Sequence, residues 1–166
     1  AKMIRDYPDQ HFIGGGEESF GYMVGDFVRD KDAVTSTLLA CEIAARAKAE
    51  GSSFYNALMQ CYVDFGCFRE RLVSLVRRGM DGAEEISRMM REFREHPPSS
   101  LDGSPIVRID DYQESASRDT REGTTHPIEL PKSNVLIYTT ADGTRLAARP
   151  SGTEPKIKVY VSVSVE

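Results

Sequence analysis

Apolar residues recur at helical spacing in the first third of the chain and predict two helices there. The first helix is expected to run between a capping residue, Asp32, and a glycine that ends it, Gly51. Its apolar stripe consists of Val34, Leu38, Cys41 and Ala45. The second helix is expected from about residue 54 to residue 66, with Ser52 or Ser53 as its cap. Its apolar face consists of Phe54, Leu58 and Cys61.

Beyond residue 66 the pattern predicts one more helix and several strands. A third helix is expected from Asp81 until Pro97 ends it, with its pair of methionines in the core. Its apolar stripe consists of Ala83, Ile86, Met90 and Phe93. Residues 157–165 alternate strictly between β-branched apolar residues and others, which is typical of a strand with one buried face. Residues 134–149 predict two strands joined at Asp142 and Gly143.

The change of pattern divides the chain into two predicted units. Residues 68–79 fit a strand or a helix, and a strand is favoured because Gly79 and Asp81 then open a fresh helix. Residues 115–133 are polar and irregular, and they predict no regular element. We therefore expect an α/β unit in residues 1–65 and an α+β unit, a helix packed on an antiparallel sheet, in residues 66–166.

Composition and charge narrow the classes of function. The chain has 166 residues, with 21 Lys and Arg against 26 Asp and Glu, and a net charge of -5. This balance favours neither nucleic acid nor a membrane surface as a partner, so a bound anion needs a local site. No apolar run approaches the roughly 20 residues of a membrane span. The three cysteines lack CxxC spacing, which argues against a disulfide framework or a zinc site and fits a cytoplasmic protein.

The motif "RPSGTEP", residues 149–155, joins two predicted strands and is suited to hold an anion. Arg149 offers a planar fork of donors, and the hydroxyls of Ser151 and Thr153 add two more. Gly152 lets backbone N–H groups approach a ligand without a Cβ in the way. The two prolines pre-order the loop, which reduces the entropy lost on binding. The alternative is a plain corner between strands, with the arginine pointing into water.

The motif "GGGEESFG", residues 14–21, brings two carboxylates and a hydroxyl into a glycine-rich loop. Glu17 and Ser19 point to the same side if the loop is extended, and they then form a pair suited to adjacent sugar hydroxyls. The alternative is a glycine-rich turn with solvated glutamates. Two acidic residues are too few for a Mg²⁺ or Ca²⁺ site, so we expect no metal ligands here. The "RDKD" run, residues 29–32, is expected to cap and balance the next helix, although its Arg or Lys could also face a sugar phosphate.

Taken together, three runs of residues resemble the α-D-phosphohexomutases, the phosphoglucomutase and phosphomannomutase superfamily. They are "GGGEESFGYMVGDFVRDKDAV", "NVLIYTTADGTRLAA" and "RPSGTEPKIKVYV". The resemblance implies the later part of an α/β/α third domain in residues 1–65, followed by a TATA-binding-protein-like fourth domain with an antiparallel sheet in residues 66–166. It also implies an exposed edge in the third-domain part, so the first ~60 residues are expected to fold less securely unless another chain covers them.

The same resemblance implies roles for single residues. Glu17 and Ser19 would hold the 3- and 4-hydroxyls of the sugar. Arg149, Ser151, Gly152 and Thr153 would hold the phosphate that is not being transferred. No run resembles the family's serine loop or its DGDGDR-like Mg²⁺ loop. No catalytic residue and no metal ligand is therefore expected in this chain, which should be inactive by itself.

The implied parent is a phosphoglucomutase that interconverts glucose 1-phosphate and glucose 6-phosphate by phosphoryl transfer through a phosphoserine. Its implied cofactor is Mg²⁺, and glucose 1,6-bisphosphate is the implied intermediate and activator. The implied partners are a hexose phosphate and the missing N-terminal domains of the same protein. The second glutamate of the GEES run, Glu18, favours glucose. A phosphomannomutase, a phosphopentomutase or a non-catalytic sugar-phosphate-binding module are the alternatives.

Overall fold

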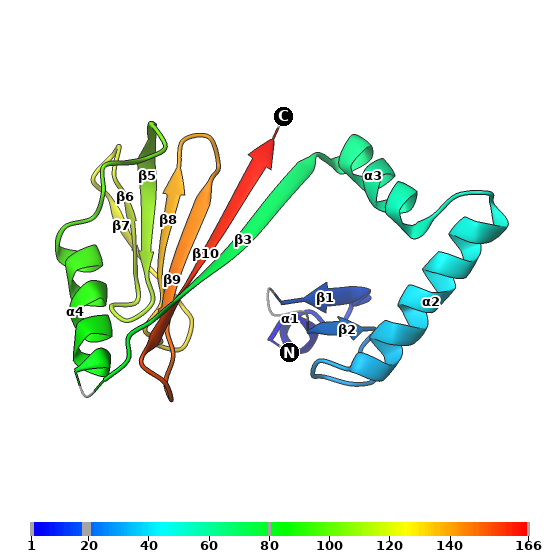
Figure 1. Ribbon diagram of the computed structural model, residues 1–166, viewed down its shortest axis with the longest axis horizontal. Coiled ribbons are helices and arrows are strands. Elements are labelled where there is room, and N and C mark those ends of the chain that lie inside the picture. Colours follow the sequence, from blue (N-terminus) through cyan, green and yellow to red (C-terminus); the bar gives the residue numbers. More distant parts are fainter. Residues whose placement is uncertain (1, 18–20, 80, 166) are drawn as a thin grey trace. The chain divides into compact units, whose positions relative to one another are not determined.

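The chain divides into two compact units, residues 1–64 and 65–166 (Figure 1). The computed structural model describes residues 2–17, 21–79 and 81–165. The boundary predicted between residues 65 and 66 lies one residue from this division. Each unit has its own sheet.

The described residues of unit 1 form a small hairpin and three helices. The elements are α1 (Lys2–Asp6), β1 (Gly14–Gly16), β2 (Tyr22–Val24), α2 (Ala33–Ala49) and α3 (Phe54–Phe65). Strands β1 and β2 pair antiparallel. Helix α2 begins where predicted, because the Asp32 carboxylate accepts hydrogen bonds from the Val34 and Thr35 amides at 3.0 and 3.4 Å. Of the two candidate caps of α3, it is Ser53 whose hydroxyl accepts from a backbone amide, that of Asn56 at 3.1 Å.

The apolar stripe of α2 is helical as predicted, but it lies on the surface. Val34 is 77% exposed and Leu38 is 69% exposed, and Ala47 is the buried residue of this helix. Helix α3 has no buried residue, and its Phe54 and Leu58 are also exposed. The sheet of this unit has two strands of three residues each, which is too small a surface to cover both helices. Among the described residues, unit 1 therefore buries little apolar surface of its own.

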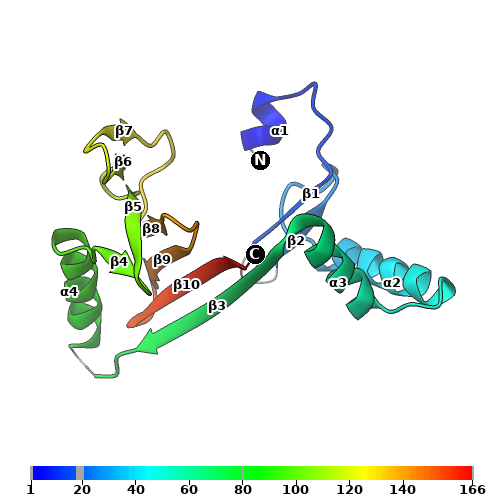
Figure 2. The same cartoon turned by 90° about the horizontal axis from the view of Figure 1, so that it is seen from above.

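Unit 2 is an antiparallel sheet with one helix, α4 (Gly82–Glu95), against it (Figures 1 and 2). The strand order is β3-β10-β9-β8-β5-β6-β7, and β4 pairs separately with β5. The strands are β3 (Cys67–Val76), β4 (Ser100–Leu101), β5 (Ser104–Asp111), β6 (Ala116–Asp119), β7 (Thr125–Pro127), β8 (Leu136–Thr140), β9 (Arg145–Pro150) and β10 (Lys156–Val165). The strand predicted in residues 68–79, the β8–β9 pair and the helix-on-sheet arrangement are confirmed.

Strands β6 and β7 are among those that the prediction missed. Strands β6 and β7 lie in residues 115–133, where the sequence predicted no regular element. They have four and three residues, and both are rich in polar side chains. Their regularity comes from pairing with β5 and with each other in successive hairpins at one end of the sheet, and the apolar pattern of the two strands does not indicate this pairing.

The core of unit 2 lies between α4 and the sheet. Its buried residues are Ile86, Met90, Ile106, Ile109, Leu136, Tyr138, Ala148 and Ile157. The methionine pair is in the core as predicted, with Met90 1% exposed and Met89 packed against the cluster. Ala83, which was predicted in the stripe, is exposed, and Gly82 is buried instead. The inward row therefore runs through Gly82, Ile86 and Met90, four residues apart each time.

Strand β10 alternates as predicted, but its buried face is short. Ile157 is fully buried, whereas Val159, Val161 and Val163 are half-buried. Strand β9 pairs only with residues 157–162 of β10, while β3 pairs with β10 along its whole length. The far end of β10 thus runs beyond the part of the sheet that packs on α4.

Tyr138 ties the sheet to the end of α4, and its replacement by phenylalanine should lower stability. Its hydroxyl donates to the Phe93 carbonyl at 2.6 Å, and the side chain is 2% exposed. We expect Tyr138→Phe to lower the free energy of unfolding of unit 2 by about 1 kcal/mol at neutral pH. The measurement is amide hydrogen exchange of β8 and β10.

The buried phenol of Tyr138 should make unit 2 less stable at alkaline pH. Burial raises the pKa of Tyr138 to about 12, and the charge of Asp111 adds to this while Arg94 opposes it. The phenol of an unfolded chain has a pKa near ~10. Its contribution is therefore fully present below pH ~10 and is lost as the pH rises toward about 12. Tyr138→Phe should flatten this alkaline slope, whereas Tyr55→Phe, at an exposed site in α3, should keep it. An unchanged slope in Tyr138→Phe would contradict the prediction.

Candidate functional site

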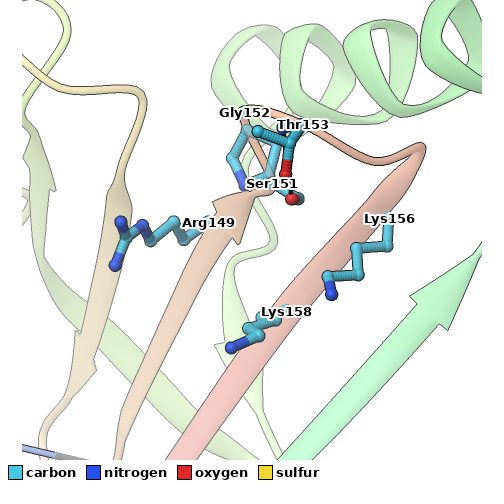
Figure 3. A pocket seen from close by; sticks show the side chains of 7 residues that line it. Arg149, Ser151, Gly152, Thr153, Lys156 and Lys158 are labelled. Carbon is cyan, nitrogen blue, oxygen red and sulfur yellow. Dashed lines mark hydrogen bonds between the residues drawn. The ribbon is translucent and has the colours of Figure 1, made fainter. Parts of the chain in front are cut away.

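The "RPSGTEP" run forms the corner between β9 and β10 (Figure 3). Strand β9 ends at Pro150 and β10 begins at Lys156. The Ser151 amide donates to the Lys156 carbonyl at 2.8 Å, which closes the corner. Inside it, the Thr153 amide donates to the Ser151 hydroxyl at 3.4 Å. A Cβ built on Gly152 would meet no atom within 4 Å, so the space over the loop is open.

A hollow of about 300 Å³ opens at this corner. It is lined by Arg149, Pro150, Ser151, Gly152, Thr153, Lys156 and Lys158. In Figure 3 the hydroxyls of Ser151 and Thr153 turn toward the side on which the two lysines extend from β10. The structure thus brings together all four residues predicted in this loop, and it adds two lysines that the prediction did not name.

The two strands deliver the three cations to one face of the sheet. Ala148 on β9 and Ile157 on β10 are fully buried against the core. Side chains alternate along a strand, so their neighbours Arg149, Lys156 and Lys158 lie on the opposite face. The sequence signal for the lysines was the run Lys-Ile-Lys, in which a core residue separates two cations.

Arg149 and Lys158 are direct cross-strand neighbours. They are paired in the register of β9 and β10, which puts their Cβ atoms roughly 5 Å apart. Like charges directly opposite each other destabilise a sheet. An anion between them would remove that repulsion and gain charge-assisted hydrogen bonds from both. The pair is therefore a feature that favours an anionic ligand over a plain corner.

Glu154 has a structural part in the loop. Its carboxylate forms an ion pair with the Lys156 ammonium. The hydrogen bond and charge of Lys156, with a smaller effect from Lys158, lower the pKa of Glu154. The carboxylate therefore stays ionised and holds the Lys156 ammonium at the rim of the hollow.

The "GGGEESFG" run begins with β1, residues 14–16, and Gly21 at its end directly precedes β2, the strand that pairs with β1. The Glu17 amide donates to the Gly21 carbonyl at 2.8 Å, and a Glu17 carboxylate oxygen lies 3.6 Å from the Lys31 ammonium. Ser19, the other predicted sugar ligand, and Glu18 lie outside the described residues. A Cβ on Gly21 would come within 2.3 Å of the Lys31 side chain and 2.7 Å of the Glu17 carboxylate. Glycine at this position thus leaves room for the ion pair.

The "RDKD" run caps a helix and also contacts the hairpin. Asp32 caps α2, and hydrogen bonds from Thr35 and the Val34 amide lower its pKa. The Lys31 ammonium lies 3.5 Å from an Asp30 carboxylate oxygen and 3.6 Å from a Glu17 carboxylate oxygen, and the charges of Asp30 and then Glu17 raise the pKa of Lys31. The Asp32 amide donates to the Tyr22 carbonyl at 2.8 Å, which fixes the run beside β2. One cation of this run therefore stands next to the predicted sugar-binding carboxylate.

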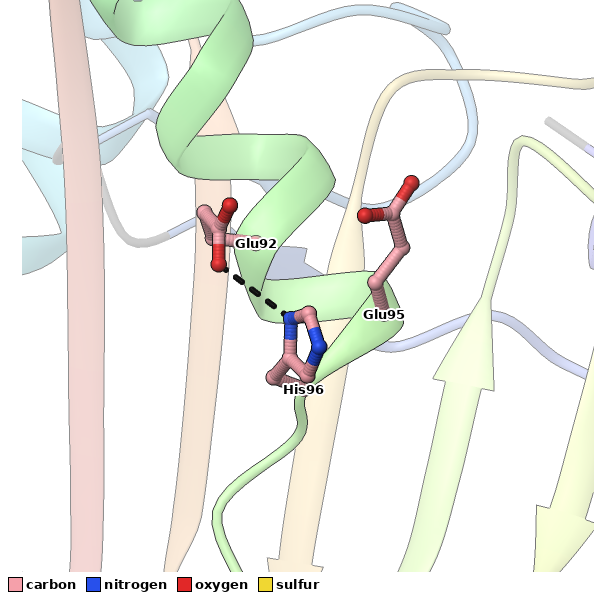
Figure 4. A group of neighbouring side chains, drawn as sticks. All are labelled: Glu92, Glu95 and His96. Atoms are coloured by element: carbon pink, nitrogen blue, oxygen red, sulfur yellow. Dashed lines mark hydrogen bonds and ion pairs between the residues drawn. The ribbon is translucent and has the colours of Figure 1, made fainter.

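One group of possible metal ligands occurs among the described residues, at the end of α4 (Figure 4). It consists of Glu92, Glu95 and His96, all exposed. His96 Nδ1 lies 3.2 Å from the Glu92 carboxylate, an ordinary pair one helical turn apart. Mg²⁺ prefers oxygen ligands in an octahedral arrangement, and this group offers two carboxylates and an imidazole. The described residues therefore do not fit the Mg²⁺ that the family resemblance implies.

No helix in the described parts of the chain combines the length and the apolar character that crossing a bilayer requires.

Comparison with known families gives the class of this protein, the α-D-phosphohexomutases. Two family models match the chain. "Phosphoglucomutase/phosphomannomutase, alpha/beta/alpha domain III" matches residues 2–62, and "Phosphoglucomutase/phosphomannomutase, C-terminal domain" matches residues 103–164. The chain belongs to the phosphoglucomutase/phosphomannomutase family, in agreement with the prediction from its motifs.

Individual relatives agree with the family models. A phosphoglucomutase of Staphylococcus aureus (strain bovine RF122 / ET3-1) is 40% identical over 164 residues, which are 98% of this chain and 30% of the relative. One of Staphylococcus haemolyticus is 35% identical over 167 residues, covering 100% of this chain and 30% of the relative. The chain thus spans about 30% of the length of these relatives.

A solved structure supports the fold. The open form of pp63/parafusin, a phosphoglucomutase from Paramecium, superposes with a TM-score of 0.57 over 98% of this chain and 27% of its own. Its sequence identity of 17% makes this a likeness of fold alone.

Proposed function

We propose that this chain is the substrate-holding part of a phosphoglucomutase, which interconverts glucose 1-phosphate and glucose 6-phosphate by phosphoryl transfer through a phosphoserine. The observation that carries the proposal is the cationic corner between β9 and β10, in a chain whose full length resembles phosphoglucomutases. We propose the cytoplasm as its location, and a hexose phosphate and the N-terminal domains of the mutase as its partners.

In this proposal the corner grips the phosphate that is not being transferred. Arg149 donates a bidentate pair of charge-assisted hydrogen bonds, Ser151 and Thr153 donate from their hydroxyls, and Gly152 presents its backbone. The lysine at position 158, opposite Arg149 in the register, completes the positive lining. A phosphate needs several donors in a fixed arrangement, and this pre-ordered corner supplies them without a conformational search.

The hairpin of unit 1 is proposed to hold the sugar. Glu17 would accept hydrogen bonds from the sugar hydroxyls together with Ser19, and Lys31 would hold the Glu17 carboxylate in place. The contribution proposed for both loops is orientation, because the reacting phosphoserine is proposed to lie in another domain of the mutase. Holding reacting groups in line can supply roughly 7 to 11 kcal/mol of barrier reduction.

Mg²⁺ and glucose 1,6-bisphosphate are proposed as cofactor and intermediate of the whole mutase. The metal would stabilise charge on the transferring phosphoryl group. The described residues of this chain do not fit the metal, so no step of the reaction is assigned to it here.

Binding of glucose 6-phosphate to the 166-residue chain tests the proposal. We expect amide resonances of residues 151–153 to shift on titration, with little response to unphosphorylated glucose at equal concentration. We expect no interconversion of the two glucose phosphates by this chain alone, because it lacks a serine loop. Absence of binding would contradict the phosphate grip, and turnover would contradict the assignment of the chemistry to other domains.

A non-catalytic sugar-phosphate-binding module is the second candidate. It is favoured by the absence of a run like the family's serine loop or its DGDGDR loop from the 166 residues. Adding these loops on a separate N-terminal segment of a related phosphoglucomutase distinguishes the two candidates. Restored turnover supports the mutase, whereas binding without any turnover supports the module.

Glu17→Gln should weaken the choice between glucose phosphate and galactose phosphate, which differ at the 4-hydroxyl that Glu17 is proposed to hold. The change keeps the size of the side chain but removes the charge that pairs with Lys31 and the strong acceptor for sugar hydroxyls. We expect the ratio of affinities for glucose 6-phosphate and galactose 6-phosphate to fall by roughly 5- to 20-fold, as hydrogen bonds to charged groups predict. The matched control is Glu50→Gln at the end of α2. Equal ratios in Glu17→Gln and the unmodified chain would remove Glu17 from sugar recognition, and phosphomannomutase or phosphopentomutase activity would then be the alternatives to test.

A further inference from the structure

Gly82, the first residue of α4, is buried where the helix meets the phosphate-binding corner. A Cβ built on it would lie 2.3 Å from the Arg77 carbonyl oxygen and 3.1 Å from the Pro155 side chain. The first distance is far below van der Waals contact, and the atom it meets belongs to the backbone, which cannot swing away as a side-chain tip can. Gly82 does not have a positive φ, so the need for glycine here is steric rather than conformational.

Arg77, whose carbonyl Gly82 leaves room for, is hydrogen-bonded to the corner between β9 and β10. The Arg77 amide donates to the Pro155 carbonyl at 2.9 Å, and Pro155 immediately precedes the first residue of β10. On the other side, the Arg77 guanidinium pairs with Glu85 of α4 at 3.2 Å. Arg77 is therefore held between the start of the helix and the end of the phosphate loop. In Figure 3 the α4 ribbon passes close to this loop.

We propose that Gly82 and the Arg77 backbone are positioning elements for the phosphate-binding loop. The inference rests on the proposed phosphate site. Close packing of Gly82 fixes the Arg77 peptide, the Arg77 N–H fixes the Pro155 carbonyl, and Pro155 sets the path from Thr153 to Lys156. Any side chain at position 82 must displace the Arg77 peptide, and the displacement passes to the loop through the hydrogen bond to Pro155.

Gly82→Ala in the full chain tests the inference, with inorganic phosphate as the probe. We expect the dissociation constant for phosphate to rise roughly tenfold or more, since misplacing a preorganised site by about 1 Å has effects of this size. Amide resonances of residues 151–153 should differ from those of the unmodified chain before phosphate is added. Both readouts report on the loop rather than on the stability of the unit.

The matched control is Met90→Ala, which removes a core side chain from the same helix without touching Arg77 or Pro155. It lowers stability and should leave phosphate affinity unchanged at a temperature where both variants are folded. Equal losses of affinity in the two variants would show a merely structural role and overturn the inference. Full affinity in Gly82→Ala overturns the inference alone, whereas no binding by the unmodified chain overturns the proposed phosphate site and the inference with it.

Hydrogen exchange of the Arg77 amide provides a second test that needs no variant. If this N–H holds the loop in its binding conformation, saturating phosphate must stabilise the hydrogen bond in return, because coupling between two sites is reciprocal. We expect exchange of this amide to slow at least severalfold on saturation, while the amide of Ala57 in α3 of unit 1 keeps its rate. An unchanged Arg77 rate in a chain that binds phosphate overturns the inference.

Discussion

Replacing Arg149 with alanine should weaken binding of glucose 6-phosphate by roughly 10- to 100-fold, the range expected for a charge-assisted bidentate contact. Arg149 supplies the planar fork that matches two phosphate oxygens, and Lys158 lies directly opposite it in the β9–β10 register. Without the fork, the point charges of Lys156 and Lys158 and two hydroxyls remain at the hollow. They still attract a phosphate, but they do not match two of its oxygens in a fixed geometry. In the whole mutase the same change should appear as a strong rise in KM.

Arg145→Ala is the matched control, because it removes the same charge from the same strand. Arg145 is four residues before Arg149 on β9, so the two arginines share a face and lie about 13 Å apart along the strand. Arg145 does not line the hollow at the corner. We expect the affinity of the Arg145→Ala chain for glucose 6-phosphate to change by less than threefold at moderate salt, because the charge is screened over that distance. Equal losses of affinity in both variants would mean that the arginines act only through their general positive charge. An unchanged affinity in Arg149→Ala would contradict the proposal that Arg149 binds the phosphate.

Met90→Ala should have the largest effect on stability, about 3 kcal/mol in the free energy of unfolding of unit 2. The side chain is 1% exposed and packs in the cluster between α4 and the sheet. Its loss removes apolar contact and leaves a cavity that the antiparallel sheet cannot collapse to fill. Because the chain has two units, one unfolding midpoint would mix them. Hydrogen exchange of the β8 amides reports on unit 2 by itself.

Leu38→Ala is the informative comparison. Leu38 stands in an apolar stripe of α2 that looks in the sequence much like the stripe of Met90, but its side chain is 69% exposed. We expect this change to alter stability by less than about 0.5 kcal/mol. A loss near that of Met90→Ala would mean that the stripe of α2 is buried against another surface in solution, such as a second chain.

The candidate site was predictable to the extent that one loop contains it. Arg149, Ser151, Gly152 and Thr153 are contiguous in the sequence, and the structure gathers all four around one hollow. The two lysines of β10 were not predicted, although the buried Ile157 between them marks both as outward-facing. Whether the two lysines can join the site depends on which strand lies beside β10. The register that places Lys158 opposite Arg149 is a property of the sheet.

The fold shows the same division between local and long-range information. Strand β3, which the pattern allowed to be a helix, is fixed by pairing with β10 along ten residues. Strands β6 and β7 lie between these cases, because they are fixed by hairpin pairing with β5 and with each other and not by strand-favouring residues of their own. Gly82 and Arg77 lie next to Pro155 in the structure, although more than 70 positions separate them from it in the sequence. No spacing in the sequence predicts these contacts.

The sequence by itself determined the family, the two loops with the side chains they carry, the helices and the alternating strands, because each depends on residues close together in the chain. Only the tertiary structure decided which apolar stripe is buried, which cations meet at the corner and why residue 82 is glycine. Burial requires an opposing surface, and a shared site requires a register, so neither is contained in a periodicity. For that reason the stripes of α2 and α4 look alike as sequence, while the first lies exposed and the second forms a core.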